Sequence, residues 1–285
     1  MRKYLPTLLK ILISVGGLLY VFSRVPLQEL GAELANIRWR WVLPALTLVY
    51  CGFVLRAFRW RTLVRGLNVT IPFGRLVYLY FVGSFFNTFL PTGFGGDVVR
   101  IMEASRDAPA HVAAGTVIVD RLTGLFMLFM MALLALPFRP AEFPQIFVIS
   151  TVTISIVGLV GGAILLEGNL IRKLGGWLPG PLSVTDPKRP LTKRLDTLQA
   201  CGKGPLLCAL TVSTLFNLLL VSIWWLFSRA LGYDIGYGYL LLVVPTMAVF
   251  LLIPSIGGLG VRESIAPALL AAAGLTAAQA VALAF

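Results

Sequence analysis

Long apolar runs, repeated along the whole chain, constrain this sequence more than any other feature. A helix that spans a bilayer needs about 20 predominantly apolar residues. Such runs are expected as helices at residues 6–23, 41–58, 73–90, 112–136, 145–166, 206–227 and 239–253, with a last helix from about 263 to 285. Charged residues make up only 13% of the chain, against about 25% in soluble domains. The sequence therefore predicts an all-α, polytopic integral membrane helical bundle, with residues 1–285 as a single transmembrane domain.

The basic residues lie mainly in short segments between these runs, although the formal net charge is +12. Segment 56–75 holds five arginines and no acid, and segment 168–205 holds seven lysines or arginines against two aspartates. This pattern is typical of cytoplasmic loops that face anionic lipid. We expect both segments and the N-terminus to be cytoplasmic, in a multi-pass protein of the cytoplasmic (inner) membrane. The expected partners are membrane lipids, with no nucleic acid.

The sequence offers little for metal or redox chemistry. The three cysteines have no CxxC spacing, and His111 is the only histidine, which excludes a two-histidine metal site within one chain. No Gly-Lys-Ser/Thr follows the glycine-rich segments, so they are not Walker loops. We expect no metal, no cofactor and no catalytic residue. Residues 25–38 show helical amphipathicity, with Glu29 and Glu33 away from the apolar face, and predict a short interfacial helix.

Two glycine- and proline-containing breaks interrupt apolar runs in a similar way. LPTGFGGDVVR (90–100) and IPSIGGLGVRE (253–263) share an aliphatic residue, a proline, a hydroxyl residue, a Gly-Gly pair and a nearby arginine. The apolar run at 73–90 must turn back at its break, because otherwise the basic segment 168–205 would not lie on the cytoplasmic side. We therefore predict two re-entrant or broken helices that dip from opposite sides, in halves of about 1–138 and 145–285 arranged as inverted repeats.

The alternative for the breaks is chance, because Gly and Pro are common in spanning helices. On the re-entrant interpretation, each restarted helix points free N–H groups and a positive dipole end into the membrane interior. That arrangement suits a phosphate or carboxylate. The breaks are therefore the expected place of a binding site for an anionic headgroup.

Ionisable residues inside the spans mark the same region. Asp120 lies about 12 Å into its expected span, where a charge is costly, and it points away from its neighbour Arg121. Both should pair elsewhere, with a pool of acids and bases beside the breaks: Asp97, Arg100, Arg262 and Glu263. The alternative role for this pool is a self-neutralising network that holds the two halves together.

Three further points concern polar residues of the first half of the chain. Arg56 and Arg59 either face the same cavity, which would make it positive, or extend to the cytoplasmic interface. Asp97 is also a candidate N-cap of the restarted helix. Asn87 is expected to bond backbone freed by the break. The full set of candidate headgroup-binding residues is Arg56, Arg59, Asn87, Gly95, Gly96, Asp97, Arg100, Asp120, Arg121, Ser255, Gly257, Gly258, Arg262 and Glu263.

Four stretches taken together carry a family resemblance: RAFRW (56–60), FFNTFLPTGFGGDVVR (85–100), VDRLTGL (119–125) and IPSIGGLGVRE (253–263). The chain resembles the lysylphosphatidylglycerol synthase transmembrane family, also called the flippase-like domain family. The resemblance implies a lipid-handling membrane region. In the best-known members of the family, such a region is joined to a soluble aminoacyltransferase domain and moves an aminoacylated phospholipid across the bilayer. Others stand alone or accompany glycosyltransferases. No transferase domain lies within these 285 residues, so aminoacyl transfer is not carried over. Related chains continue further after the second break, so we expect a short or truncated final span.

The primary hypothesis for function is a flippase or transporter that moves a phospholipid or lipid-linked phosphate headgroup through a polar cavity between the broken helices. A membrane-embedded transferase on lipid-linked substrates is one alternative, although Glu29 and Glu33 fit a helix face better than a catalytic loop. The other is a scaffold subunit that docks a partner lipid synthase or glycosyltransferase through segment 168–205. A transporter fits the sequence better than an enzyme does.

Overall fold

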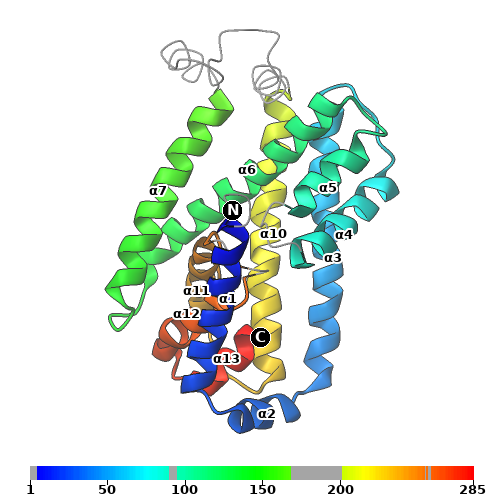
Figure 1. Ribbon diagram of the computed structural model, residues 1–285. Helices are drawn as coiled ribbons and strands as arrows, with labels where there is room; N and C mark the ends of the chain where they lie inside the picture. Colours follow the sequence, from blue (N-terminus) through cyan, green and yellow to red (C-terminus); the bar gives the residue numbers. More distant parts are fainter. Residues whose placement is uncertain (1–4, 90–94, 168–200, 254, 256–257) are drawn as a thin grey trace.

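The computed structural model describes residues 5–89, 95–167, 201–253, 255 and 258–285, and no strand occurs within them (Figure 1). Segment 168–200, most of the expected basic loop, lies outside the described residues. The helices are α1 (Leu5–Arg24), α2 (Leu27–Ala35), α3 (Trp39–Gly66), α4 (Phe73–Phe89), α5 (Gly95–Ala104), α6 (Ala110–Ala135), α7 (Gln145–Glu167), α10 (Lys203–Ala230), α11 (Tyr237–Phe250), α12 (Val261–Leu270) and α13 (Ala277–Ala284), with short 3-10 turns at Leu136–Phe138 and Ala271–Ala273.

Four of these helices are long and apolar enough to cross a membrane: α3, α6, α7 and α10. They coincide with expected spans, which confirms a polytopic, all-α membrane protein. Their boundaries differ in detail. Helix α3 continues past the expected end at Phe58 to Gly66, and α10 begins at Lys203, inside the expected loop. Pro205 does not prevent this early start, because the first turn of a helix tolerates proline.

The two breaks produce two pairs of short helices at opposite ends of the bundle. Helices α4 and α5 pack against each other in the upper half of Figure 1, beside α3 and α6. Helices α11 and α12 pack against each other in the lower half. The two pairs thus lie toward opposite ends of the bundle. That each pair dips into the membrane and returns stays a prediction. The order of one long helix followed by one short pair occurs once in each half.

Apolar packing surrounds each of these pairs. Around α4, the side chains of Trp60, Leu76, Leu79 and Val117 are almost or fully inaccessible. Around α11, a larger cluster joins residues of α10, α12 and α13, with Leu240, Val243 and Met247 at its centre. Because lipid is as apolar as these faces, close van der Waals packing and not removal from water holds the pairs as parts of the bundle.

The expected single helix from about 263 to 285 is wrong. Helix α12 ends at Leu270, and Gly274 then adopts a left-handed conformation (φ 78°), which terminates the helix at little steric cost. Helix α13 begins after Thr276, whose hydroxyl accepts a bond from the Gln279 N–H. The local chemistry of stopping and capping therefore outweighs the continuous apolar composition.

The amphipathic segment forms α2, and it packs onto one end of the bundle. Leu30 is buried beside Val21 of α1 and Val25 in the short connection between α1 and α2. Glu33, which the sequence places away from the apolar face of this helix, accepts a 2.8 Å hydrogen bond from the Tyr233 hydroxyl. Burial of Tyr233, together with the Glu33 carboxylate, raises the pKa of the phenol above its ordinary value. Helix α2 thus links the start of the chain to the α10–α11 connection.

Candidate functional site

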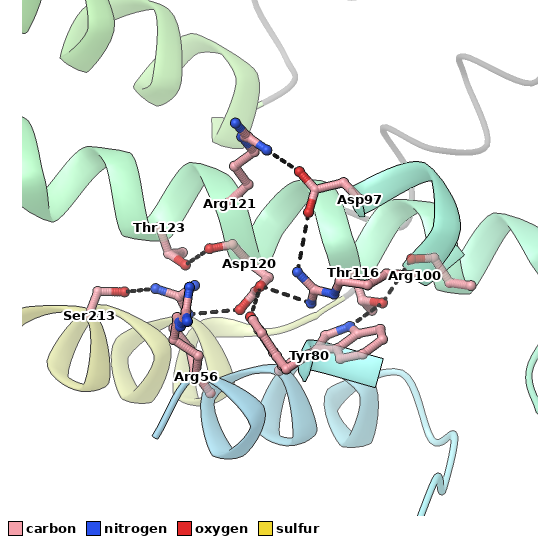
Figure 2. A network of polar contacts seen from close by, with 12 residues as sticks. Arg56, Tyr80, Asp97, Arg100, Thr116, Asp120, Arg121, Thr123 and Ser213 are labelled. Atoms are coloured by element: carbon pink, nitrogen blue, oxygen red, sulfur yellow. Dashed lines mark hydrogen bonds and ion pairs between the residues drawn. The ribbon is translucent and has the colours of Figure 1, made fainter. Parts of the chain in front are cut away.

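A polar cavity of about 310 Å³ lies where the α4–α5 pair meets α3, α6, α10 and α11 (Figure 2). Its lining combines charged and polar side chains with a smaller apolar set. These residues are Arg56, Arg59, Tyr80, Gly83, Ser84, Asn87, Asp97, Arg100, Asp120, Arg121, Gly124, Leu125, Leu128, Phe216, Asn217, Leu220 and Ala248. Seven of the fourteen candidate residues named from the sequence therefore line one space, and all seven belong to the first half of the chain.

Asp120 is the centre of this cavity's polar network. It lies about 15 Å along α6 and is 1% exposed. Its carboxylate accepts a 2.7 Å bond from Arg59 Nε and a 3.2 Å bond from Arg100 Nη2, and Tyr80 donates its hydroxyl to the same group. A buried charge is tolerated only when it is paired and hydrogen-bonded. Three helices, α3, α4 and α5, therefore supply the partners that a carboxylate on α6 requires.

Asp97 forms a second centre and joins α5 to α6. Its carboxylate accepts a 3.3 Å bond from Arg100 Nη1 and a bond from Arg121 Nη1. As expected, Asp120 and Arg121 do not pair with each other and find separate partners beside the first break. Asp97 lies in the first turn of α5, which begins at Gly95, so it is not the N-cap of the described helix.

Asn87 has the backbone role expected of it. Its side-chain oxygen accepts a 2.8 Å bond from the Gly96 N–H, at the start of the restarted helix. Gly96 also approaches α4 so closely that a Cβ atom would overlap the Gly83 carbonyl oxygen. Glycine at this position therefore lets the two arms of the pair touch through their backbones.

None of the described residues of the second break lines this cavity. The expectation that Arg262 and Glu263 would pair with Asp120 and Arg121 is wrong, because among the described residues no ion pair joins them. Arg262 pairs with its neighbour Glu263 at 3.2 Å, and the Glu263 carboxylate also accepts the Gly260 N–H at 2.7 Å. Glu263 is fully buried. It is satisfied locally, at the beginning of its own helix, so it does not need a partner across the bundle.

The other candidates at the second break also lie apart from the cavity. Ser255 is buried and its hydroxyl donates to the Ile253 carbonyl at 3.4 Å. Gly258 has a φ of 83°, a turn conformation that favours glycine. Gly257 lies outside the described residues. Arg262 instead lines a separate, mainly apolar pocket of about 370 Å³ between α2, α3, α10 and α13.

Arg56 and Arg59 both line the cavity, so neither extends to the interface as the alternative required. Arg59 is 5% exposed and bonds Ser213 of α10 as well as Asp120. The Arg56 guanidinium lies over the rings of Phe53 and Phe216, at 4.8 Å each. Among the described residues, no carboxylate lies within ion-pair distance of Arg56. With four arginines and two aspartates in its lining, the cavity carries a formal charge of +2.

Tyr80, Ser213 and Asn217 belong to this site but were not selected from the sequence. Tyr80 reaches Asp120, Ser213 reaches Arg59, and Asn217 lines the cavity. Asn217 did carry a signal, because a side-chain amide inside a long apolar span is costly unless it has a function or a partner. Tyr80 and Ser213 carried none, since tyrosine and serine are frequent in spanning helices.

Comparison with known proteins agrees with the fold and the motifs. The family described as the lysylphosphatidylglycerol synthase TM region matches residues 7–285. A protein of Pyrococcus horikoshii, named UPF0104 membrane protein PH1989, is 29% identical over 140 residues, which are 47% of this chain and 40% of that protein. The chain thus spans less than half the length of the curated relative it matches. No solved structure matches it. Because the family match covers nearly the entire sequence, this chain belongs to the family of the lysylphosphatidylglycerol synthase TM region.

Proposed function

We propose that this protein moves the headgroup of a phospholipid or of a lipid-linked phosphate across the membrane through the cavity around Asp120. The observation that carries this proposal is the formal charge of +2 on the lining of a cavity that lies between apolar helices. An uncompensated positive charge at membrane depth is expensive, and such sites mark substrate pathways. An anion in the cavity would offset that cost.

The size and chemistry of the cavity fit a headgroup. Its volume of about 310 Å³ is at the lower end of ligand sites, which hold roughly 300–1,000 Å³. Guanidinium groups suit phosphate because their planar donors can bond two oxygens at once. The acyl chains would remain in the bilayer, against outward-facing apolar side chains such as Tyr50, Val54 and Phe81.

Lipid movement in proteoliposomes tests the proposal. The purified chain is reconstituted with fluorescent phospholipids of several headgroups, and dithionite is added to quench the label in the outer leaflet. We expect quenching to extend beyond the outer-leaflet fraction seen in empty liposomes. The Arg65→Gln variant is the matched control, because Arg65 is an exposed arginine at the end of α3 and outside the cavity. If a folded protein moves no headgroup above the empty-liposome level, the proposal is wrong.

A further inference from the structure

We infer that the cavity selects a net anionic headgroup, and that Arg56 and Asn217 bind its phosphate while the other three arginines hold the helices together. This inference rests on the proposed function and narrows its substrate class. Zwitterionic and cationic headgroups, including aminoacylated ones, would be disfavoured. Four observations carry it, and each concerns which polar groups are already engaged.

Three of the four cavity arginines are engaged by carboxylates. Arg59 and Arg100 bond Asp120, and Arg100 and Arg121 bond Asp97. Three of these four bonds join two different helices, and the fourth, between Arg100 and Asp97, lies within α5. Because the loss of one partner would leave a buried charge uncompensated, these three arginines have a structural role before any ligand arrives.

Arg56 differs from these three. Its Nε donates a long 3.4 Å bond to the Gly52 carbonyl of its own helix, and rings surround the guanidinium: Phe53, Tyr80 and Phe216. Aromatic faces stabilise a cation without consuming its N–H donors, so the terminal nitrogens of Arg56 remain available for an acceptor. Among the described residues that line the cavity, it is the arginine without a carboxylate partner.

Asn217 supplies a second available donor. It lies on α10, next to the Phe216 ring that covers Arg56, and its side chain is 6% exposed. Its Nδ2 is buried and has no hydrogen-bond partner among the described residues. The same holds for Nε of Arg100, which also lines the cavity. An unpaired buried donor costs free energy, and an acceptor such as a phosphate oxygen would remove that cost.

The carboxylates of the cavity are not available in the same way. Asp97 and Asp120 each accept bonds from two arginines, and Asp120 also accepts one from Tyr80. An ammonium or quaternary ammonium group would therefore meet engaged acids and an unpaired arginine. A phosphate without a positive substituent needs only the available donors and no free carboxylate. This difference is the physical basis of the selectivity.

Binding and transport should be measured separately on the full chain. For binding, native mass spectrometry is run on protein with equimolar phosphatidylglycerol and phosphatidylcholine, and then with glycerol phosphate as the soluble form of the same chemistry. We expect bound phosphatidylglycerol to exceed bound phosphatidylcholine, and glycerol phosphate to bind less than the lipid. For transport, the dithionite assay is run with both labelled lipids.

Variants of the two proposed residues test the assignment. Arg56→Gln should reduce the preference for phosphatidylglycerol by roughly tenfold, the factor expected when one charged hydrogen bond is lost, and Arg56→Lys should retain most of it. Asn217→Asp places a carboxylate beside Arg56 and should abolish the preference. Arg65→Gln is the control and should retain it. Thermal unfolding in detergent shows whether each variant remains folded.

The outcomes separate this inference from the proposed function. Transport of both lipids at equal rates, with equal binding, would overturn the anionic selectivity and leave lipid movement intact. Selective binding that depends on Arg56, without transport of any lipid, would support the site and contradict the flippase. Binding of glycerol phosphate as tight as that of the lipid would overturn a lipid headgroup as the occupant. Unchanged selectivity in folded Arg56→Gln and Asn217→Asp proteins would refute the assignment to these residues.

Discussion

At the scale of single residues, Asp120 determines how the first half of the molecule is held together. One carboxylate on α6 receives donors from α3, α4 and α5, and Arg59 extends the connection to α10 through Ser213. Asp120, Arg59 and Arg100 are each at most 5% exposed. A paired buried charge of this kind contributes little to net stability compared with an apolar replacement, but loss of one partner is costly.

Replacement of Asp120 by alanine should therefore destabilise the protein strongly. It leaves Arg59 and Arg100 buried without their shared acid, and such losses cost about 3–5 kcal/mol. The measurement is thermal unfolding in detergent, followed by tryptophan fluorescence. Asp234→Ala is the control, because the side chain of Asp234 is 83% exposed and its pair with Arg229 lies at the surface. Equal unfolding temperatures for the two variants would show that Asp120 has no such role.

Cys201 gives a prediction about pH. Burial raises the pKa of its thiol to about 11, above the ordinary value for cysteine. The reactive thiolate therefore becomes populated only as the pH approaches 11. In a Cys51→Ser, Cys208→Ser background, we expect negligible maleimide labelling at neutral pH in the folded protein and full labelling after unfolding in SDS. Rapid labelling of the folded protein at neutral pH would contradict the burial of Cys201.

At the scale of elements, the α4–α5 pair combines side-chain packing with a close backbone contact. Gly83 and Gly96 face each other across the pair, and Asn87 bonds the Gly96 N–H. At the open end of the pair, Arg75 of α4 bonds Glu103 of α5 at 3.1 Å and Asp107 at 3.0 Å. The pair is thus fixed at both ends, and this fixes the position of Asp97 and Arg100 against α6.

A methyl group at Gly96 should separate the two arms. Its Cβ would overlap the Gly83 carbonyl oxygen and lie 2.7 Å from Asn87 Cγ, so the helices must shift. Overpacking of this kind costs about 1–3 kcal/mol, and the shift should also reduce lipid movement. Gly74→Ala on the same helix pair is the control, since nothing lies within 4 Å of its added Cβ. Gly96→Ala protein with the stability and transport of Gly74→Ala would contradict the close contact.

At the scale of the whole molecule, the two short pairs lie toward opposite ends, and this decides which connections share a side of the membrane. The α3–α4 and α5–α6 connections lie at the upper end of Figure 1 with the starts of α6 and α10. The α6–α7 and α10–α11 connections lie at the lower end. With the basic segments inside, we propose that the upper end is cytoplasmic.

Cysteine accessibility in intact cells tests this topology. In a cysteine-free background, Thr70→Cys and Ala110→Cys flank the α4–α5 pair, and Glu142→Cys lies in the α6–α7 connection; all three positions are exposed. A membrane-impermeant maleimide added outside should label Glu142→Cys and leave the other two unlabelled until the membrane is opened. If residues 73–104 crossed the membrane instead, Thr70→Cys and Ala110→Cys would react from opposite sides.

The sequence alone determined the membrane class, the main spans, the two turning points, and the presence of Asp97, Arg100, Asp120 and Arg121 in one polar region. These are consequences of hydropathy, proline and glycine placement and charge cost, which are properties of short stretches of chain. A local signal was also present but missed at Gly274 and Thr276, where the last helix breaks.

Only the tertiary structure decided which charges meet. From sequence, Arg262 and Glu263 belonged to the pool of expected partners for Asp120 and Arg121. In the structure Glu263 is satisfied by Gly260 and Arg262 beside it, and neither Arg262 nor Glu263 lines the cavity. Tyr80, Ser213 and Asn217 join the site because α4 and α10 pack against α3 and α6. Which partner a buried charge finds depends on how the helices pack, and sequence periodicity carries no information on that. Within the described part of the chain, the same packing leaves Arg56 without a carboxylate partner, and this contributes to the positive charge of the cavity.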